Sequence, residues 1–196
     1  MADKPSQDGI IPLSNWDTPL GRLVLGGRQT WSRGTGLAEY RVFGMYAAVL
    51  LLTGGGCYSD RLGNRRRVEA GDLILVFPEL GHHYGPEHAG ERWDEVFVTF
   101  EGAAFDAWRS HGLDPAHPVW RVDPGAERAI EGLIHAPAHT MADACTAVAK
   151  LHTLLAGWLA QRPADASPPW LEEARRQLSQ PHSPVVEEVS RRVGLS

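Results

Sequence analysis

Three histidines lie close together in the sequence, His82, His83 and His88, and imidazole nitrogens commonly bind transition metals. A metal site normally needs at least three convergent protein ligands. His82 and His83 are adjacent, so on an extended backbone their side chains point to opposite sides. We therefore predict no metal in this chain, and we expect these histidines to cap loops at the rim of the fold.

A second group of reactive side chains alternates strictly with apolar ones in the stretch ERWDEVFVTF, residues 91–100. In an extended strand, Trp93, Glu95 and Phe97 share one face, and the intervening apolar residues share the other. A carboxylate accepts two parallel hydrogen bonds, which suits vicinal hydroxyls, while aromatic rings offer a stacking surface. A buried Glu95 is costly without a partner, so it needs either an arginine or a ligand.

These side chains belong to a region of short apolar segments bounded by glycine and proline. The segment YAAVLLL, residues 46–52, ends at TGGG, and GDLILVFP, residues 71–78, lies between turn residues. Between these segments, CYSDR and RRRVEA flank LGN, whose Gly63-Asn64 pair suits a tight hairpin turn. Strands at this regular spacing predict a β-sandwich or barrel from residue 20 to about residue 122.

The following region has helical periodicity. An apolar stripe runs along residues 141–159, and we predict that it packs as core against the sheet. Alternatively, the flank that carries Leu154 and Trp158 pairs with a second chain. The residues of the stripe are Met141, Cys145, Val148, Leu151 or His152, Leu155, and Trp158 or Leu159.

The C-terminal part of the chain contains a linker and then a short helical segment. Residues 162–169 are rich in proline and small residues, which is typical of a linker. The last fourteen residues, SPVVEEVSRRVGLS, combine an N-cap at Ser183, a valine stripe and a glycine at position 194. A capped helix, a glycine turn and a new Leu-Ser cap form the first half of a helix-turn-helix. An ordinary amphipathic helix is the alternative for this segment.

Composition limits the remaining classes of protein. The chain has 196 residues and a net charge of −5, so it has no basic excess to attract nucleic acid non-specifically. Its polar start lacks the apolar stretch of a secretory signal, and no apolar run is long enough to span a membrane. Two cysteines far apart, Cys57 and Cys145, indicate free thiols in a reducing compartment. We expect a cytoplasmic protein.

Taken together, the three regions resemble the AraC family of bacterial transcription regulators. The resemblance is carried by RVFGMYAAVLLLTGGGC, by VEAGDLILVFPELGHHYGPEHAGERWDEVFVTF and by LEEARRQLSQPHSPVVEEVSRRVGLS. It implies a mainly β fold with C-terminal helices: a cupin-like barrel (a double-stranded β-helix or jelly roll), a two-helix dimerisation region and the first helices of a helix-turn-helix domain. The expected domains are an N-terminal arm (1–19), a sensing and dimerisation domain (20–161), a linker (162–169) and a truncated DNA-binding domain (170–196).

The resemblance also implies a ligand site inside the barrel. Arg41, Tyr84, Glu95 and Phe97 correspond to pocket positions of the arabinose-responsive members, and Arg28 falls near another. Trp93 offers stacking or, alternatively, packs in the wall, and Trp16 of the arm is expected to act as a lid. Two alternatives are that Glu95 and Arg41 simply pair across the barrel and that Arg28 is a solvated surface charge. The predicted ligand-binding residues are therefore Arg41, Tyr84, Glu95, Phe97, Trp93, Arg28 and Trp16.

The function implied by this resemblance is regulation of transcription by a small polar effector, a sugar or a related metabolite, without enzymatic activity, cofactor or membrane association. The expected partners are DNA and RNA polymerase, in the full-length protein only, and a second copy of the chain bound through the Met141–Leu159 helix. Since the second helix of a helix-turn-helix reads the bases, we expect residues 1–196 to bind operator DNA no better than random DNA.

The rival hypothesis is a small metal-dependent cupin enzyme, an isomerase or a dioxygenase. Metal-dependent cupins resemble one another in a His-X-His…Glu set on an early strand. The corresponding stretch of this chain, LLLTGGGCYSD, has no histidine.

Overall fold

A computed structural model describes residues 9–88 and 90–161. The chain divides into two compact units, residues 1–161 and residues 162–196, and the described residues belong to the first. The predicted linker at 162–169 and the helix-turn-helix segment at 170–196 therefore lie outside the described residues, as do the first eight residues of the predicted arm.

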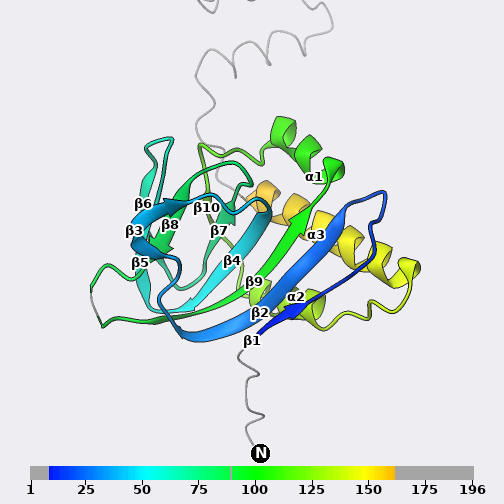
Figure 1. The fold of residues 1–196 in the computed structure, drawn as a ribbon, viewed down its shortest axis with the longest axis horizontal. Helices are drawn as coiled ribbons and strands as arrows, with labels where there is room; N and C mark the ends of the chain where they lie inside the picture. The colour runs from blue at the N-terminus through cyan, green and yellow to red at the C-terminus, as the bar shows by residue number, and fades with distance from the viewer. Residues whose placement is uncertain (1–8, 89, 162–196) are drawn as a thin grey trace, which may run out of the picture. The chain divides into compact units, whose positions relative to one another are not determined.

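The described region contains ten strands in two antiparallel sheets, which confirms the prediction of a mainly β fold (Figure 1). The six-stranded sheet has the spatial order β1 (Gly9–Pro12), β2 (Arg22–Ser32), β9 (Trp93–Glu101), β4 (Tyr46–Thr53), β7 (Asp72–Val76) and β10 (Val119–Arg121). The four-stranded sheet has the order β3 (Gly36–Arg41), β8 (His82–Gly85), β5 (Gly55–Asp60) and β6 (Arg65–Glu69). Strand pairing does not join the two sheets into a closed barrel within the described residues.

Two longer helices cover one face of the six-stranded sheet, and two short helical segments follow β9 (Figure 1). The predicted helix at 141–159 is confirmed as α3, Met141–Gln161. The others, whose ranges were not predicted, are α1 (Ala103–Asp106), the 3₁₀ helix η1 (Ala107–His111) and α2 (Ala126–Ile134).

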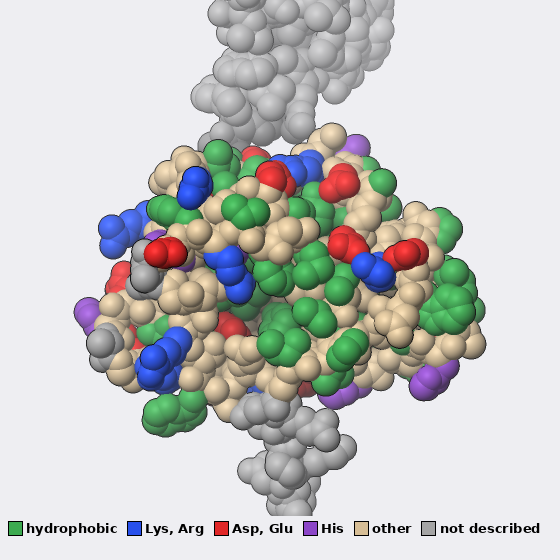
Figure 2. Space-filling model, in the orientation of Figure 1, with side chains coloured by type: hydrophobic (Ala, Val, Ile, Leu, Met, Phe, Trp, Pro, Cys, Tyr) green, Lys and Arg blue, Asp and Glu red, His purple; other side chains and the backbone are tan. Residues whose placement is uncertain are grey.

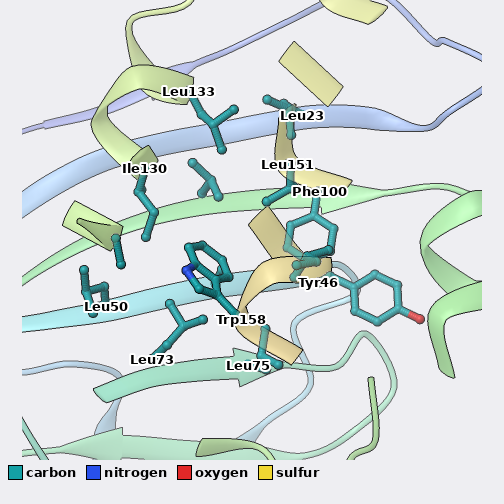
Figure 3. Close-up of a cluster of buried hydrophobic side chains, with 14 of the residues drawn as sticks. Leu23, Tyr46, Leu50, Leu73, Leu75, Phe100, Ile130, Leu133, Leu151 and Trp158 are labelled. Atoms are coloured by element: carbon teal, nitrogen blue, oxygen red, sulfur yellow. The ribbon is translucent and has the colours of Figure 1, made fainter. Parts of the chain in front are cut away.

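Alternation along the strands separates two hydrophobic cores. On β4, Ala47, Val49 and Leu51 face the four-stranded sheet and form an inter-sheet core with Tyr58, Val76 and Trp93. Their neighbours Tyr46, Ala48 and Leu50 point the other way, into a larger core shared with α2 and α3 (Figure 3). Central strands with both faces covered are expected to be apolar throughout, which explains the unbroken run YAAVLLL.

The helix α3 contributes to this larger core through part of its predicted stripe. Leu151, Leu155 and Trp158 are buried there, whereas Met141 is 42% exposed and does not belong to it. Trp158 is buried, and Leu154 also packs against this core. Trp158 therefore does not face a second chain, whereas Leu154 is half-buried and its pairing with a second chain stays a prediction.

The predicted hairpin turn between CYSDR and RRRVEA is confirmed, and it joins β5 to β6. Gly63 has a φ of 88°, which a side-chain-bearing residue rarely adopts. The Asp60 carboxylate accepts hydrogen bonds from the backbone N–H groups of Leu62 and Asn64 at 2.9 and 3.1 Å. The buried Tyr58 hydroxyl donates to the same carboxylate at 3.0 Å. The turn thus fixes the end of the four-stranded sheet.

Candidate functional site

A cavity of about 190 Å³ lies between the two sheets. This volume is more than ten times the roughly 10–15 Å³ that one water molecule needs, so the space accommodates a small organic molecule. Strand β9 supplies one wall of the cavity with Glu95, Phe97 and Thr99, which share one face of the strand. The polar side chains that line the cavity are Gln29, Thr35, Arg41, Tyr84, Glu95 and Thr99, and the remaining lining is mostly apolar.

Glu95 lies at the cavity wall, is only 4% exposed and binds two neutral donors. Trp93 Nε1–H donates to Oε2 at 2.7 Å, and the Ser32 hydroxyl donates to Oε1 at 3.2 Å. Burial raises the pKa of this carboxyl group, and the hydrogen bonds and the charge of Arg41 only partly offset it. No ion pair joins Glu95 to Arg41 in the described part of the chain, so the predicted alternative of direct pairing is not observed.

The environment of Glu95 makes stability depend on pH. The folded-state pKa of Glu95 lies above the ordinary value of 4.5. The stability that the protonated Glu95 side chain contributes is therefore complete below pH 4.5 and is lost as pH rises through the folded-state pKa. Glu95→Gln retains an acceptor for Trp93 without the buried charge. We expect this variant to unfold at higher urea concentration than wild type near neutral pH, with the difference vanishing toward pH 4.5. Urea titrations between about pH 4 and pH 8 measure it.

The matched control is Glu87→Gln, which neutralises an exposed carboxylate. Its stability is expected to follow the wild-type pH profile. A Glu95→Gln variant less stable than wild type at neutral pH would show that the carboxylate is favourable in its ionised form.

Arg41 and Tyr84 come to the cavity from the four-stranded sheet. Arg41 ends β3 opposite His82 of β8, and its guanidinium carbon lies 4.8 Å from the centroid of the Phe43 ring. Tyr84 of β8 is 6% exposed and stacks on Trp93 at a centroid distance of 6.1 Å. Burial raises the pKa of the Tyr84 hydroxyl, which therefore stays protonated and able to donate.

Four of the seven predicted ligand-binding residues thus line one cavity: Arg41, Tyr84, Glu95 and Phe97. Trp93 does not line it, because its ring is buried in the inter-sheet core, where it packs and holds Glu95. Trp16 is 40% exposed in the segment after β1 and is likewise not among the lining residues.

Arg28 faces away from the cavity. On β2 it lies opposite Val96, and its guanidinium forms ion pairs with Glu127 and, at 2.6 Å, Glu131 of α2. Its neighbour Gln29 lies opposite Glu95 and lines the cavity. Successive strand residues alternate between the two faces of a sheet. A sequence correspondence that is uncertain by one position therefore does not decide whether Arg28 or Gln29 faces the cavity.

The lining includes further residues that were not predicted, among them Ile10 and Phe43. Ile10 of β1 reaches the cavity from the arm, and hydrophobic side chains gather over β1 and β2 on the face shown in Figure 2. Phe43 lies in the loop between β3 and β4. Its only sequence signal is its position two residues after Arg41, which places both side chains on one side of an extended segment.

The histidines occupy three different environments. His82 is fully buried between Tyr58 and Tyr84, at centroid distances of 6.4 and 5.9 Å, and burial lowers its pKa. His82 therefore does not lie at the rim, although its Nδ1 lies 2.9 Å from the carbonyl oxygen of Leu80 in the preceding loop. His83 is half-buried on the other side of β8, where its ring is tilted against that of Tyr40 at a centroid distance of 4.7 Å, and His88 is exposed. Across residues 9–88 and 90–161, no three His, Cys, Asp or Glu residues are placed to hold a metal ion.

The fold and the cavity together define a cupin-like ligand-binding domain. Residues 39–155, more than half of the sequence, match the AraC-like ligand-binding domain, and the chain belongs to this family. The match is to a ligand-binding domain of regulators, and it gives no support to the rival hypothesis of a cupin enzyme. No curated protein sequence is similar enough to this chain to count as a match.

Similar solved structures include regulators and cupin proteins. A variant of apo ToxT from Vibrio cholerae aligns over 93% of this chain and 72% of its own, at 8% identity and a TM-score of 0.50, which supports the fold alone. The AraC-like transcriptional activator CuxR aligns over 91% and 69%, at 15% identity and a TM-score of 0.47. YhaK from Escherichia coli aligns over 49% and 45%, at 13% identity and a TM-score of 0.40, so the matched region is less than half of that protein.

None of the helices in the described ranges is long and apolar enough to cross a membrane.

Proposed function

We propose that this chain is the sensor of a transcription regulator and that it binds a small polar effector, such as a sugar or a related metabolite, between its two sheets. The observation that carries the proposal is that Arg41, Tyr84, Glu95 and Phe97, which come from three different strands, all line one cavity. Hydrogen-bonding groups beside an aromatic wall are the usual lining of a small-molecule site.

The N-terminal arm is the proposed element of response. Strand β1 pairs with β2 from Gly9 to Pro12, and Ile10 from this edge strand lines the cavity while remaining 55% exposed. A bound effector that contacts Ile10 favours the docked arm over the undocked one. Such a shift requires the effector to bind the two arm states with different affinities.

In the full-length protein, we propose that the arm controls sequence-specific DNA binding by a helix-turn-helix to which residues 170–196 contribute. We also propose a homodimer through α3, RNA polymerase as a partner of the full-length protein, and a cytoplasmic location. Small or polar side chains on the exposed side of α3, among them Ala149, Thr153 and Ala156, support close approach of a second helix.

The proposal predicts that one substitution in the cavity weakens both effector binding and the effect of the effector on operator affinity. A thermal-shift screen of sugars, sugar acids and aromatic acids should yield a compound that raises the Tm of residues 1–196. Phe97→Ala, which removes the aromatic wall, is expected to weaken its binding about tenfold. In the full-length protein, gel-shift titrations should show that the effector changes the affinity for the operator. The Phe97→Ala variant should need about ten times more effector for the same change.

The control is Trp31→Ala, which removes an aromatic side chain that is 78% exposed and does not line the cavity. Its effector affinity should equal that of wild type. An effector whose affinity is unchanged by Phe97→Ala binds elsewhere and would contradict the proposal.

A further inference from the structure

We propose that the effector is a small monocarboxylate with an apolar or aromatic body, anchored by Arg41 and Tyr84, rather than a neutral sugar. This inference rests on the proposed function, because it assigns a ligand class to the same cavity. Its basis is the set of hydrogen-bond donors and acceptors on the cavity wall that have no partner within the described protein.

The acceptors of the cavity are largely engaged by the protein itself. Both carboxylate oxygens of Glu95 already accept hydrogen bonds, from Trp93 and Ser32. The Ser32 hydroxyl also lies 3.3 Å from Gln29 Oε1, and its single proton serves one of these two oxygens at a time. Each oxygen keeps a second lone pair, so a sugar with vicinal hydroxyls would have to share acceptors that already hold a buried N–H and a hydroxyl.

The two threonines of the wall are committed to the backbone. Thr99 Oγ1 accepts from the Leu25 N–H at 2.9 Å, and Thr35 Oγ1 accepts from the Tyr84 N–H at 2.9 Å. Thr35 Oγ1 also lies within hydrogen-bond distance of the Tyr84 carbonyl oxygen. These side chains therefore shape the wall more than they offer new acceptors to a ligand.

The groups that remain free are donors. Within residues 9–88 and 90–161, neither the Arg41 guanidinium nor the Tyr84 hydroxyl has a hydrogen-bond or ion-pair partner, and both residues line the cavity. A guanidinium offers up to five N–H groups in a planar fork, and a protonated phenol adds one O–H. A carboxylate matches this set, since it only accepts and binds arginine in two parallel hydrogen bonds.

The charge of the lining leads to the same conclusion. Among the lining residues that the structure describes, Arg41 and Glu95 are the only ones with ionisable acid or base groups apart from Tyr84, and burial raises the pKa of Glu95. No ion pair joins Arg41 to a carboxylate within the described residues, so the protein does not neutralise this guanidinium directly. A ligand with one negative charge neutralises it, whereas a neutral sugar leaves it unbalanced.

The rest of the wall suits an apolar body. Phe43, Phe97, Val49 and Val76 face the cavity with hydrocarbon alone. Sugar hydroxyls buried against these side chains would lose water without gaining partners, which is unfavourable for each group. Phe43 also lies against the Arg41 guanidinium, which holds the anchoring cation beside the apolar surface.

Isothermal titration calorimetry with matched probes tests this inference. The acids are benzoate and hexanoate, the neutral counterparts are benzamide and hexanamide, and the sugars are arabinose and glucose. Residues 1–196 should bind at least one acid, and its amide about tenfold to a hundredfold more weakly, because a charge-assisted contact is lost. Arg41→Gln should weaken acid binding by a similar factor and leave amide binding unchanged. Arg128→Gln, which neutralises an exposed arginine of α2, should bind every probe like wild type.

Three outcomes would overturn the inference. Binding of a sugar but of neither acid, with loss in Phe97→Ala, would refute the carboxylate while supporting the cavity as the effector site. Acid binding that is equal in wild type and Arg41→Gln would refute the anchor. Absence of binding by every probe would count against both the ligand class and the proposed function.

Discussion

Replacing Trp158 with alanine is expected to lower the free energy of unfolding by about 3–5 kcal/mol, the range for truncating a large buried aromatic residue. Trp158 is 2% exposed near the end of α3 and packs with Leu73, Leu75 and Tyr46 of the six-stranded sheet (Figure 3). Alanine leaves a void that neighbours on rigid strands do not fill. Urea denaturation followed by far-ultraviolet circular dichroism measures the change without depending on tryptophan fluorescence.

Met141→Ala provides the control on the same helix. Met141 is 42% exposed at the start of α3, so its truncation should change stability by no more than about 0.5 kcal/mol. If Trp158→Ala were as stable as this control, the C-terminal half of α3 would not be part of the larger core. It would then be free to pack on a second chain instead.

The strands that define the cavity were predictable because strand alternation is a local property of the sequence. The alternation at 91–100 correctly placed Glu95 and Phe97 on one face of β9 and Val96 and Val98 on the other. The turn at Gly63-Asn64 was predictable for the same reason, since glycine tolerates a positive φ that few other residues adopt.

The predictions for Arg28 and His82 were wrong because the positions of these side chains depend on pairing between strands that are distant in the sequence. Gln29, and not Arg28, faces the cavity because of the register between β2 and β9, which no local pattern of β2 encodes. His82 is buried because β8 lies between β3 and β5, so that Tyr58 and Tyr84 enclose its ring. The same histidine on an edge strand would be exposed, and its neighbours in sequence do not distinguish these cases.

The position of Tyr84 depends on how closely two backbones approach in the four-stranded sheet. A Cβ added to Gly56 of β5 would lie 2.1 Å from the carbonyl oxygen of Gly85 and 2.9 Å from Cα of Pro86. Both contacts are with backbone, and a strand held by neighbours on both sides cannot yield as the end of a flexible side chain does. Gly85 directly follows Tyr84 on β8, so any displacement also moves a residue that lines the cavity.

We therefore expect Gly56→Ala to destabilise the protein by about 3 kcal/mol, the upper part of the usual range for overpacking, and to weaken binding of any ligand held by Tyr84. Gly132→Ala is the matched control with the opposite sign. Gly132 lies in α2 with no atom within 4 Å of its added Cβ, so alanine should stabilise the helix by about 0.5–1 kcal/mol. Urea titrations of both variants give the two free energies. Equal stabilities would mean that β5 and β8 separate without cost, and the close pairing that fixes the cavity wall would then not be a determinant of the fold.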